Sequence, residues 1–239
     1  MTIAEQILDY ASMQQQPFRR SNLMEFLGKN DVSESSAHVL LNRLVKQGLL
    51  VKAGYGLYSV PEKTKLPFVY KLSEEEKEMA AQVKKKFPFA DFCVWKPSVL
   101  VQYMHHIPAL GMILIDVERV AMESVFHFLQ EMFPSQHILL NPNAQECERY
   151  ITTDKLFIVR ALVNEAPITK VEDIPVPTIE KVLVDAAGDK ELSFAQGSEL
   201  CTIYENAFNT NIINTARLLR YAKRRNRKEN ILGIINALK

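Results

Sequence analysis

A helical pattern, a glycine and two short apolar runs follow one another between Ser33 and Val60. At about 100° per residue, the first part of this stretch divides into an apolar side and a mostly polar side. The apolar side consists of Ala37, Leu40, Leu41, Leu44 and Val45, and the opposite side of Ser35, His38, Val39, Asn42, Arg43 and Lys46. Gly48 follows where helices commonly end in left-handed backbone, and residues 49–52 and 57–60 have the composition of paired strands. A helix followed by a hairpin in this order predicts a winged helix.

Two further helices are expected before this stretch. Thr2 and Glu5 have the spacing of a capping box at the start of a first helix. Ser21 can cap a short second helix, and Ser33 can cap the third, because a serine hydroxyl accepts a hydrogen bond from a free backbone N–H. Three helices and a hairpin within residues 1–62 predict a winged helix-turn-helix domain.

Such a domain places its third helix in the major groove of DNA. The amide of Asn42 can bind an adenine edge, and the guanidinium of Arg43 can bind guanine or a phosphate. Other polar or basic side chains of the domain are expected at the DNA backbone. The full set of expected DNA-binding residues is Arg19, Arg20, Ser33, Ser35, Ser36, His38, Asn42, Arg43, Lys46, Lys52 and Tyr55.

The charge of this domain leaves an alternative open. Residues 1–60 contain six lysines and arginines against five acidic residues, a weak electrostatic footprint for a DNA-binding domain. Winged helices also dock other proteins, and the polar side of the third helix is equally compatible with a solvated surface. DNA binding and protein docking are therefore both considered.

The composition of the whole chain bounds its class. With 239 residues, of which 47% are hydrophobic, the chain can bury the cores of two domains. No run of 18 apolar residues and no signal-peptide pattern is present, so a cytoplasmic protein without a membrane partner is expected. Cys93, Cys147 and Cys201 are scattered, which favours reduced thiols over disulfides or a metal site.

The rest of the chain alternates strand and helix patterns after a proline-containing linker at residues 61–70. Strands are predicted at 92–95, 112–115, 137–140, 156–160 and 168–171, and helices at 72–87, 118–133, 179–187, 196–208, 211–225 and 230–238. Residues 70–239 are thus expected to form a mixed α/β domain with a helical cap. The predicted fold class is α+β, an N-terminal winged helix-turn-helix followed by this domain.

Basic residues gather near the end of the sequence. Residues 216–239 contain eight lysines and arginines and one acid, whereas residues 61–215 contain fifteen against twenty-two. Arg217, Arg220, Arg224 and Lys228 recur every three or four residues and are expected to form a basic ridge, opposite an inward side of Ile212, Ile213, Ala216 and Leu219. The ridge suits a second polyanion contact, a partner contact or a solvated helix face.

No catalytic motif is complete. The chain lacks a Gly-x-x-x-x-Gly-Lys loop and a Gly-x-Gly-x-x-Gly loop. Asp116 and Glu118 end a buried strand, where a metal-dependent nuclease places its acids, but the usual Glu-x-Lys strand is missing. No catalytic residue, metal ligand or cofactor is therefore expected, and a DNA-targeted nuclease is kept as an alternative.

Two segments and the layout of nearly the whole chain resemble a known family. The segments are GLLVKAGYGLYSV at residues 48–60 and PTIEKVLVD at residues 177–185, followed by a helical, arginine-rich tail. They resemble the AbiEi-like abortive-infection antitoxins and related transcriptional regulators. The resemblance implies a DNA-binding repressor of its own operon that counteracts a nucleotidyltransferase-type toxin encoded beside it. Double-stranded operator DNA, the toxin and a second copy of the chain on DNA are the expected partners.

Overall fold

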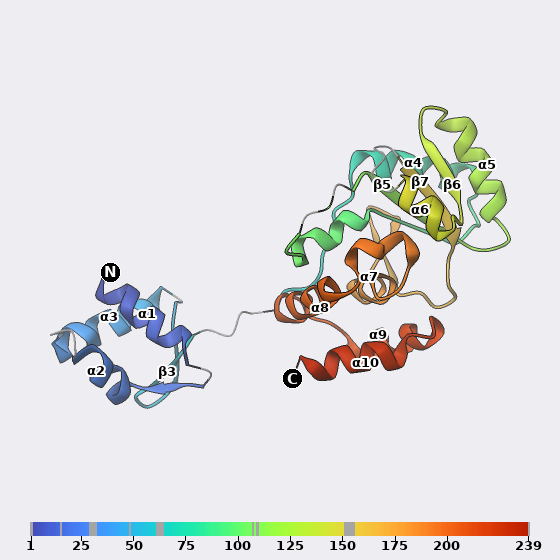
Figure 1. Ribbon diagram of the computed structural model, residues 1–239. Coiled ribbons are helices and arrows are strands. Elements are labelled where there is room, and N and C mark those ends of the chain that lie inside the picture. The colour runs from blue at the N-terminus through green and yellow to red at the C-terminus, as the bar shows by residue number, and fades with distance from the viewer. Residues whose placement is uncertain are drawn as a thin grey trace. The chain divides into compact units, whose positions relative to one another are not determined.

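The computed structural model forms two compact units, Met1–Thr64 and Lys65–Lys239 (Figure 1). It describes residues 2–14, 16–28, 33–47, 49–60, 65–106, 108, 110–150 and 156–238. Helices and several small sheets together give the mixed α+β class that was predicted. Within these ranges, no helix has the length and apolar character needed to cross a lipid bilayer.

The first unit combines three helices with a three-stranded antiparallel sheet of order β1-β3-β2. Its elements are α1 (Ile3–Ser12), β1 (Phe18–Arg19), α2 (Arg20–Gly28), α3 (Glu34–Lys46), β2 (Val51–Gly54) and β3 (Leu57–Ser59). The capping box of Thr2 and Glu5 at α1 and the Ser33 cap of α3 are confirmed. The predicted Ser21 cap is wrong, because β1 leads directly into α2 and Ser21 already lies inside the helix.

The core of the first unit confirms the two predicted sides of α3. Ala37, Leu41 and Leu44 are buried, and Leu40 and Val45 are partly buried against the same cluster. Burial of each large aliphatic side chain contributes roughly 1.5–3 kcal/mol. The residues on the opposite side of the helix, from Ser35 to Lys46, are exposed. The predicted role of Gly48 in ending the helix lies outside the described residues.

The second unit is built on a four-stranded sheet of order β4-β5-β7-β6. Its strands are β4 (Phe92–Trp95), β5 (Met112–Val117), β6 (His137–Leu140) and β7 (Leu156–Ala161). Strand β4 is antiparallel to β5, whereas β5, β7 and β6 are parallel. All four strands were predicted. Because the three parallel strands end at the same edge, the loops after them converge there.

A separate hairpin pairs β8 (Ile168–Val171) with β9 (Ile174–Pro177). Only β8 was predicted. Pro175 and Pro177 lie within β9, where proline is tolerated because one edge of a two-stranded ribbon needs no hydrogen bonds. Glu172 and Asp173 adopt positive φ angles of 50° and 63° at the turn between the strands.

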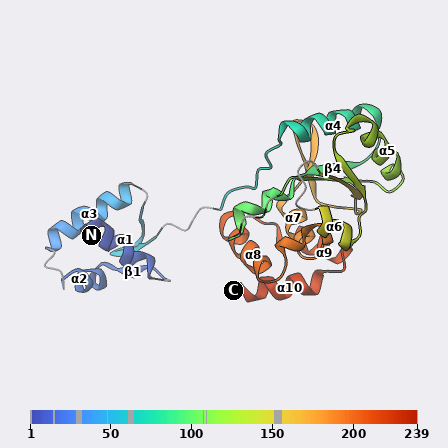
Figure 2. The ribbon, with the colours of Figure 1, turned by 45° about the horizontal axis from the view of Figure 1, so that its top comes forward.

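Both faces of the four-stranded sheet are covered (Figures 1 and 2). The helices α4 (Glu74–Lys86) and α5 (Met122–Met132) lie on one face, and α7 (Ile179–Ala186), α8 (Ser198–Thr210), α9 (Thr215–Arg224) and α10 (Lys228–Ala237) form the predicted helical cap beside the other. Shorter helices are α6 (Ala144–Tyr150), η1 (Pro97–Tyr103) and η2 (Lys190–Ala195). Every residue of α7 is buried, so this helix is the centre of the second unit.

The predicted inward side of the helix around residue 216 is only partly correct: Ile213 and Leu219 are partly buried against the core of the second unit, but Ile212 and Ala216 are exposed. The buried residues of α9 are Leu218, Tyr221 and Ala222, while Ile212 is 59% exposed. The helix begins only at Thr215, after Asn214 caps it by accepting the N–H of Arg217. The predicted helix began at residue 211, four residues before α9 starts, so Ile212 was assigned to a helix face although it lies outside the helix.

Candidate functional site

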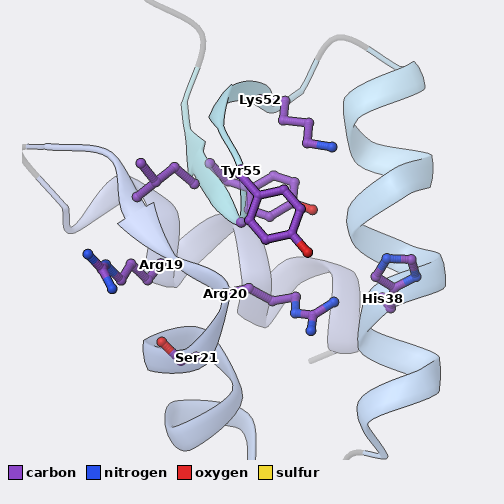
Figure 3. A pocket seen from close by; sticks show the side chains of 9 residues that line it. Arg19, Arg20, Ser21, His38, Lys52 and Tyr55 are labelled. Atoms are coloured by element: carbon purple, nitrogen blue, oxygen red, sulfur yellow. The ribbon is translucent and has the colours of Figure 1, made fainter.

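A basic hollow of about 470 Å³ lies on the first unit (Figure 3). The described residues that line it are Arg19, Arg20, Ser21, His38, Lys52, Tyr55, Gly56, Leu57 and Tyr58, and none of them is acidic. Figure 3 shows the guanidinium of Arg20 and the hydroxyl of Tyr55 directed toward the space beside α3, where His38 lies, while Arg19 points away from α3. Five of the predicted DNA-binding residues thus line one concave surface.

The backbone explains why residues so far apart in the sequence meet here. The N–H of Arg20 donates a hydrogen bond of 2.9 Å to the carbonyl oxygen of Gly56, which ties the start of α2 to the β2–β3 turn. Gly56 has a φ of +66°, a left-handed conformation that glycine adopts without a steric penalty. Tyr55, beside it, is fully exposed.

The three cations around the hollow have no carboxylate partner within the described ranges of the chain. Arg19, Arg20 and Lys52 are exposed, and in the part of the chain that the structure describes none of them forms an ion pair. His38 Nδ1 lies 3.4 Å from Asn42 Nδ2 on the next turn of α3, which links the hollow to the outer face of that helix. A concave surface with unpaired cations is suited to bind an anion.

The other predicted DNA-binding residues lie outside the hollow. Asn42, Arg43 and Lys46 are exposed along α3. Ser33, Ser35 and Ser36 cluster at its start, where the Ser33 hydroxyl accepts the Ser36 N–H at 3.3 Å and lies 2.8 Å from the Ser36 hydroxyl. Sequence reasoning missed Ser21, Gly56, Leu57 and Tyr58 as lining residues, because only the pairing of β1 with β3 brings them together.

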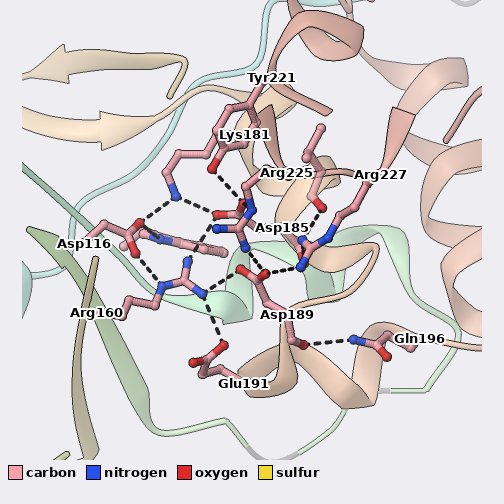
Figure 4. Close-up of polar contacts among 12 residues, drawn as sticks. Asp116, Arg160, Lys181, Asp185, Asp189, Glu191, Gln196, Tyr221, Arg225 and Arg227 are labelled. Carbon is pink, nitrogen blue, oxygen red and sulfur yellow. Dashed lines mark hydrogen bonds and ion pairs between the residues drawn. The ribbon is translucent and has the colours of Figure 1, made fainter. Parts of the chain in front are cut away.

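The second unit contains a buried ionic network that sequence reasoning missed (Figure 4). Its cations are Arg160, Lys181, Arg225 and Arg227, and its carboxylates are Asp116, Asp185, Asp189 and Glu191. The signal in the sequence is that Arg160 ends an apolar strand and that Lys181 and Asp185 interrupt the apolar helix α7.

Arg160 is the hub of this network. Its guanidinium contacts Asp116 and lies 3.1 Å from Asp185, 2.7 Å from Asp189 and 3.4 Å from Glu191. A guanidinium has five N–H donors and can serve several carboxylates at once. The network thereby joins β5 and β7 of the sheet to α7 and the segment after it.

Asp116 and Lys181 remain charged in the interior. Burial alone would raise the pKa of Asp116, but Arg160 and Lys181 outweigh burial and hold that pKa well below its usual range. Burial would lower the pKa of Lys181, yet Asp116 and Asp185 keep it above its ordinary value. Lys181 Nζ lies 2.6 Å from an oxygen of each of these aspartates. The charges of the four cations and the four carboxylates of the network cancel.

The position of Asp116 bears on the nuclease alternative. Asp116 is 2% exposed, and its oxygens accept hydrogen bonds from Arg160, Lys181 and the indole N–H of Trp95. Glu118 accepts the backbone N–H of Asp91 at 3.2 Å. Across the described ranges, no group of three or more histidine, cysteine or acidic side chains is arranged to hold a metal ion.

The predicted basic ridge is interrupted. Arg217 lies 3.5 Å from Glu180, and Arg224 pairs with Glu165 at 2.5 Å, whereas Arg220 and Lys228 are exposed without an ion pair among the described residues. Lys228 does not share a helix with the three arginines. The chain turns between α9 and α10, because Arg225 and Arg227 are drawn inward to Asp189 and Asn226 adopts a φ of 56°.

The protein thus consists of a small unit of three helices and a three-stranded sheet, which carries a basic hollow, and an α/β unit, which contains a buried ionic network. The chain belongs to DUF6577, a family of unknown function, whose family model matches residues 36–239. The match begins within α3 and includes β2, β3 and the whole second unit. No curated protein matches the chain.

Proposed function

We propose that the first unit is a winged helix that binds double-stranded DNA and that the protein is a transcriptional regulator. The observation that carries this proposal is the hollow beside α3, where Arg19, Arg20 and Lys52 form no ion pair with any carboxylate among the described residues. In this arrangement, α3 enters the major groove and the β2–β3 hairpin is the wing that lies along the DNA backbone. A phosphate of the backbone then occupies the hollow.

The exposed side of α3 supplies the sequence readout. Asn42 and Arg43 offer the amide and the guanidinium that bind adenine and guanine edges. Val39, which is 65% exposed between them and the start of the helix, offers an apolar surface for a thymine methyl group. The three serines at the start of α3 contact phosphates through hydroxyl and N–H groups.

The resemblance to AbiEi-like antitoxins supports a more specific role. In this role the protein represses its own operon, binds the operator as a homodimer and counteracts a nucleotidyltransferase-type toxin encoded beside it. Catalysis then belongs to the toxin, and this chain contributes DNA binding and toxin binding. A neighbouring reading frame that encodes a nucleotidyltransferase would support this role.

Protein docking by the first unit is the second candidate. Exposed apolar side chains favour it: Val39, Leu49, Val51 and Tyr55 are all exposed on the same unit as the hollow. Large exposed apolar side chains that gather on one surface are typical of protein interaction sites. The two candidates differ in their dependence on salt, since only DNA binding releases condensed counterions.

The experiment is a titration of the full-length protein with a fluorescent duplex from the promoter of its own gene, repeated over a series of salt concentrations. We expect the logarithm of the affinity to fall linearly with the logarithm of the salt concentration. The double variant Arg20→Ala, Lys52→Ala should bind more weakly and reduce that slope by about one for each lost phosphate contact. A control, Lys84→Ala at an exposed position of α4, should leave both unchanged. Absence of salt-dependent binding by the unaltered protein would favour docking.

A further inference from the structure

A second hollow, of about 300 Å³, lies in the second unit at the carboxyl ends of the three parallel strands. Arg119 follows β5, Asn141 follows β6, and Arg160 and Ala161 end β7. In open α/β sheets, ligands bind in the crevice outside the carboxyl ends of the strands. The fold therefore places this hollow where a small-molecule site is expected.

The other wall of the hollow comes from two turns of the helical cap. Residues 188–191 follow α7, and Arg225 and Arg227 lie between α9 and α10. A Cβ at residue 188 would lie 3.0 Å from Arg227 Nε and 3.1 Å from its Cζ, which is tighter than an ordinary contact. Gly188 thus leaves room for the guanidinium of Arg227 beside the backbone.

Cations outnumber carboxylates around this hollow. Its charged lining consists of Arg119, Arg160, Lys190, Arg225 and Arg227 against Asp189 and Glu191. Both carboxylates are already engaged, Asp189 with three of the arginines and Glu191 with Arg160. Together with the buried Lys181, Asp116 and Asp185, the network residues of the lining make four cations and four carboxylates, whose charges cancel. The surplus positive charge therefore belongs to Arg119 and Lys190, neither of which has an ion-pair partner in the described part of the unit.

The donors in the wall are fixed in place before any ligand arrives. Asp189 accepts hydrogen bonds from Arg160, Arg225 and Arg227, which holds the guanidinium groups of the two cap arginines. Arg225 Nε is a buried N–H without a hydrogen-bond acceptor among the residues described, and the carboxylate oxygen of Asp185 near it is 3.8 Å away. Donors held in this way lose little conformational freedom when they bind an anion.

An adjoining hollow of about 530 Å³ extends the site. It shares Arg119, Ala161, Val163 and Arg225 with the first and continues along Leu162, Asn164, Arg224 and Asn226. The two volumes lie within the range of about 300–1,000 Å³ that is usual for small-molecule pockets. The mixed lining of apolar and amide side chains can accommodate an organic group attached to the anion.

We propose that this site binds a small phosphorylated molecule, with its phosphate between Arg119, Lys190 and the fixed cap arginines and its organic part in the adjoining hollow. A phosphate suits the site because arginine guanidinium groups bind its oxygens in a forked, charge-assisted geometry. The site lies wholly within the second unit. It does not rest on DNA binding by the first unit.

The test uses isothermal titration calorimetry and thermal unfolding of the full-length protein. Pyrophosphate and AMP are the probes, adenosine is the uncharged comparison, and a short single-stranded oligonucleotide tests the alternative source of phosphate. The double variant Arg119→Ala, Lys190→Ala removes the two unpaired cations and leaves the buried network intact. Its matched control is Arg149→Ala, Lys84→Ala, which removes one exposed arginine and one exposed lysine from α6 and α4.

We expect AMP and pyrophosphate, but not adenosine, to bind and to raise the unfolding temperature. The double variant should lose about tenfold or more in affinity, because each lost charge-assisted hydrogen bond weakens binding substantially, while the control retains it. The proposal is overturned if neither phosphate probe binds, or if the double variant binds as tightly as the unaltered protein. Binding of the oligonucleotide alone would also overturn it, in favour of a nucleic-acid contact.

Discussion

Lys181 Nζ and Asp116 Oδ2 lie 2.6 Å apart in the interior of the second unit, where a helix residue neutralises an aspartate of the central sheet. Both side chains are almost completely buried. An ion pair in this position adds little net stability compared with an apolar pair, but removal of one partner leaves a buried charge without compensation. The predictions on stability follow from this asymmetry.

The first prediction concerns Lys181→Met. The substitution keeps an unbranched side chain, one atom shorter, but leaves Asp116 and Asp185 without their shared cation. We expect a loss of about 3–5 kcal/mol in the free energy of unfolding of the second unit. Urea denaturation followed by circular dichroism measures this loss. Lys84→Met, on the exposed side of α4, is the control and should change stability by less than about 0.5 kcal/mol.

The second prediction concerns pH. Burial opposes ionisation of Asp116 and Asp189, but neighbouring cations outweigh burial and lower the pKa of both carboxyls. Their contribution to stability is present above the unfolded-state pKa of about 3.9 and is lost as the pH falls below it. The pKa of Lys181 is raised, so its contribution is lost only at strongly alkaline pH.

We therefore expect the unfolding temperature of the second unit to be nearly constant between about pH 6 and pH 9 and to fall steeply below about pH 4. Thermal unfolding across this range tests the expectation. A steady decline that begins near neutral pH would show that other groups, such as the histidines, control the acid sensitivity.

The third prediction separates base contacts from phosphate contacts in the proposed DNA complex. Arg43→Ala should cost about 1–3 kcal/mol of binding free energy and relax the preference for the operator, because Arg43 is expected at a base edge. Lys52→Ala should weaken binding to all duplexes by a similar factor, because Lys52 is expected at the backbone. Equal losses on operator and random duplexes for both variants would contradict the assignment of Arg43.

The fourth prediction concerns α9. Arg220 is exposed and unpaired among the described residues, whereas Arg224 pairs with Glu165 at the surface. We expect α9 to contact DNA. Arg220→Glu should then lower the slope of log affinity against log salt concentration by about one, the value of one lost phosphate contact, and leave the unfolding temperature unchanged. An unchanged salt dependence together with a weakened complex with a toxin would assign this helix to the protein partner instead.

The predictions that the structure confirms were made from residues that lie close together in the sequence. The two sides of α3 follow from the spacing of Ala37, Leu41 and Leu44, and the start of α1 from the capping box of Thr2 and Glu5. Each depends on residues within a few positions of one another. The sequence pattern is enough to predict such features, because a single helix turn determines them.

Contacts between distant residues could not be predicted in the same way. Asp116 and Lys181 are 65 positions apart, and Asp116 and Arg160 are 44 apart. From the sequence, Asp116 is an acid near the end of a strand, where it could bind a metal ion. The sequence does not show that Arg160 and Lys181 pair with its carboxylate. The late start of α9 misplaced part of its predicted inward side, and the position of Tyr221 was not predicted either, because its hydroxyl donates a hydrogen bond to Asp185, 36 positions away, which no local pattern encodes.

The order in which the network's residues are synthesised has a consequence for how the second unit folds. Asp116 and Arg160 leave the ribosome with the sheet, but Lys181, Arg225 and Arg227 follow only with the cap helices. Before the cap is present, the sheet face that carries Asp116 and Arg160 lacks both its cover and the other partners of these charges, so it stays incompletely packed until the turn between α9 and α10 has emerged. The sheet and its cap are therefore expected to fold in one late, cooperative step.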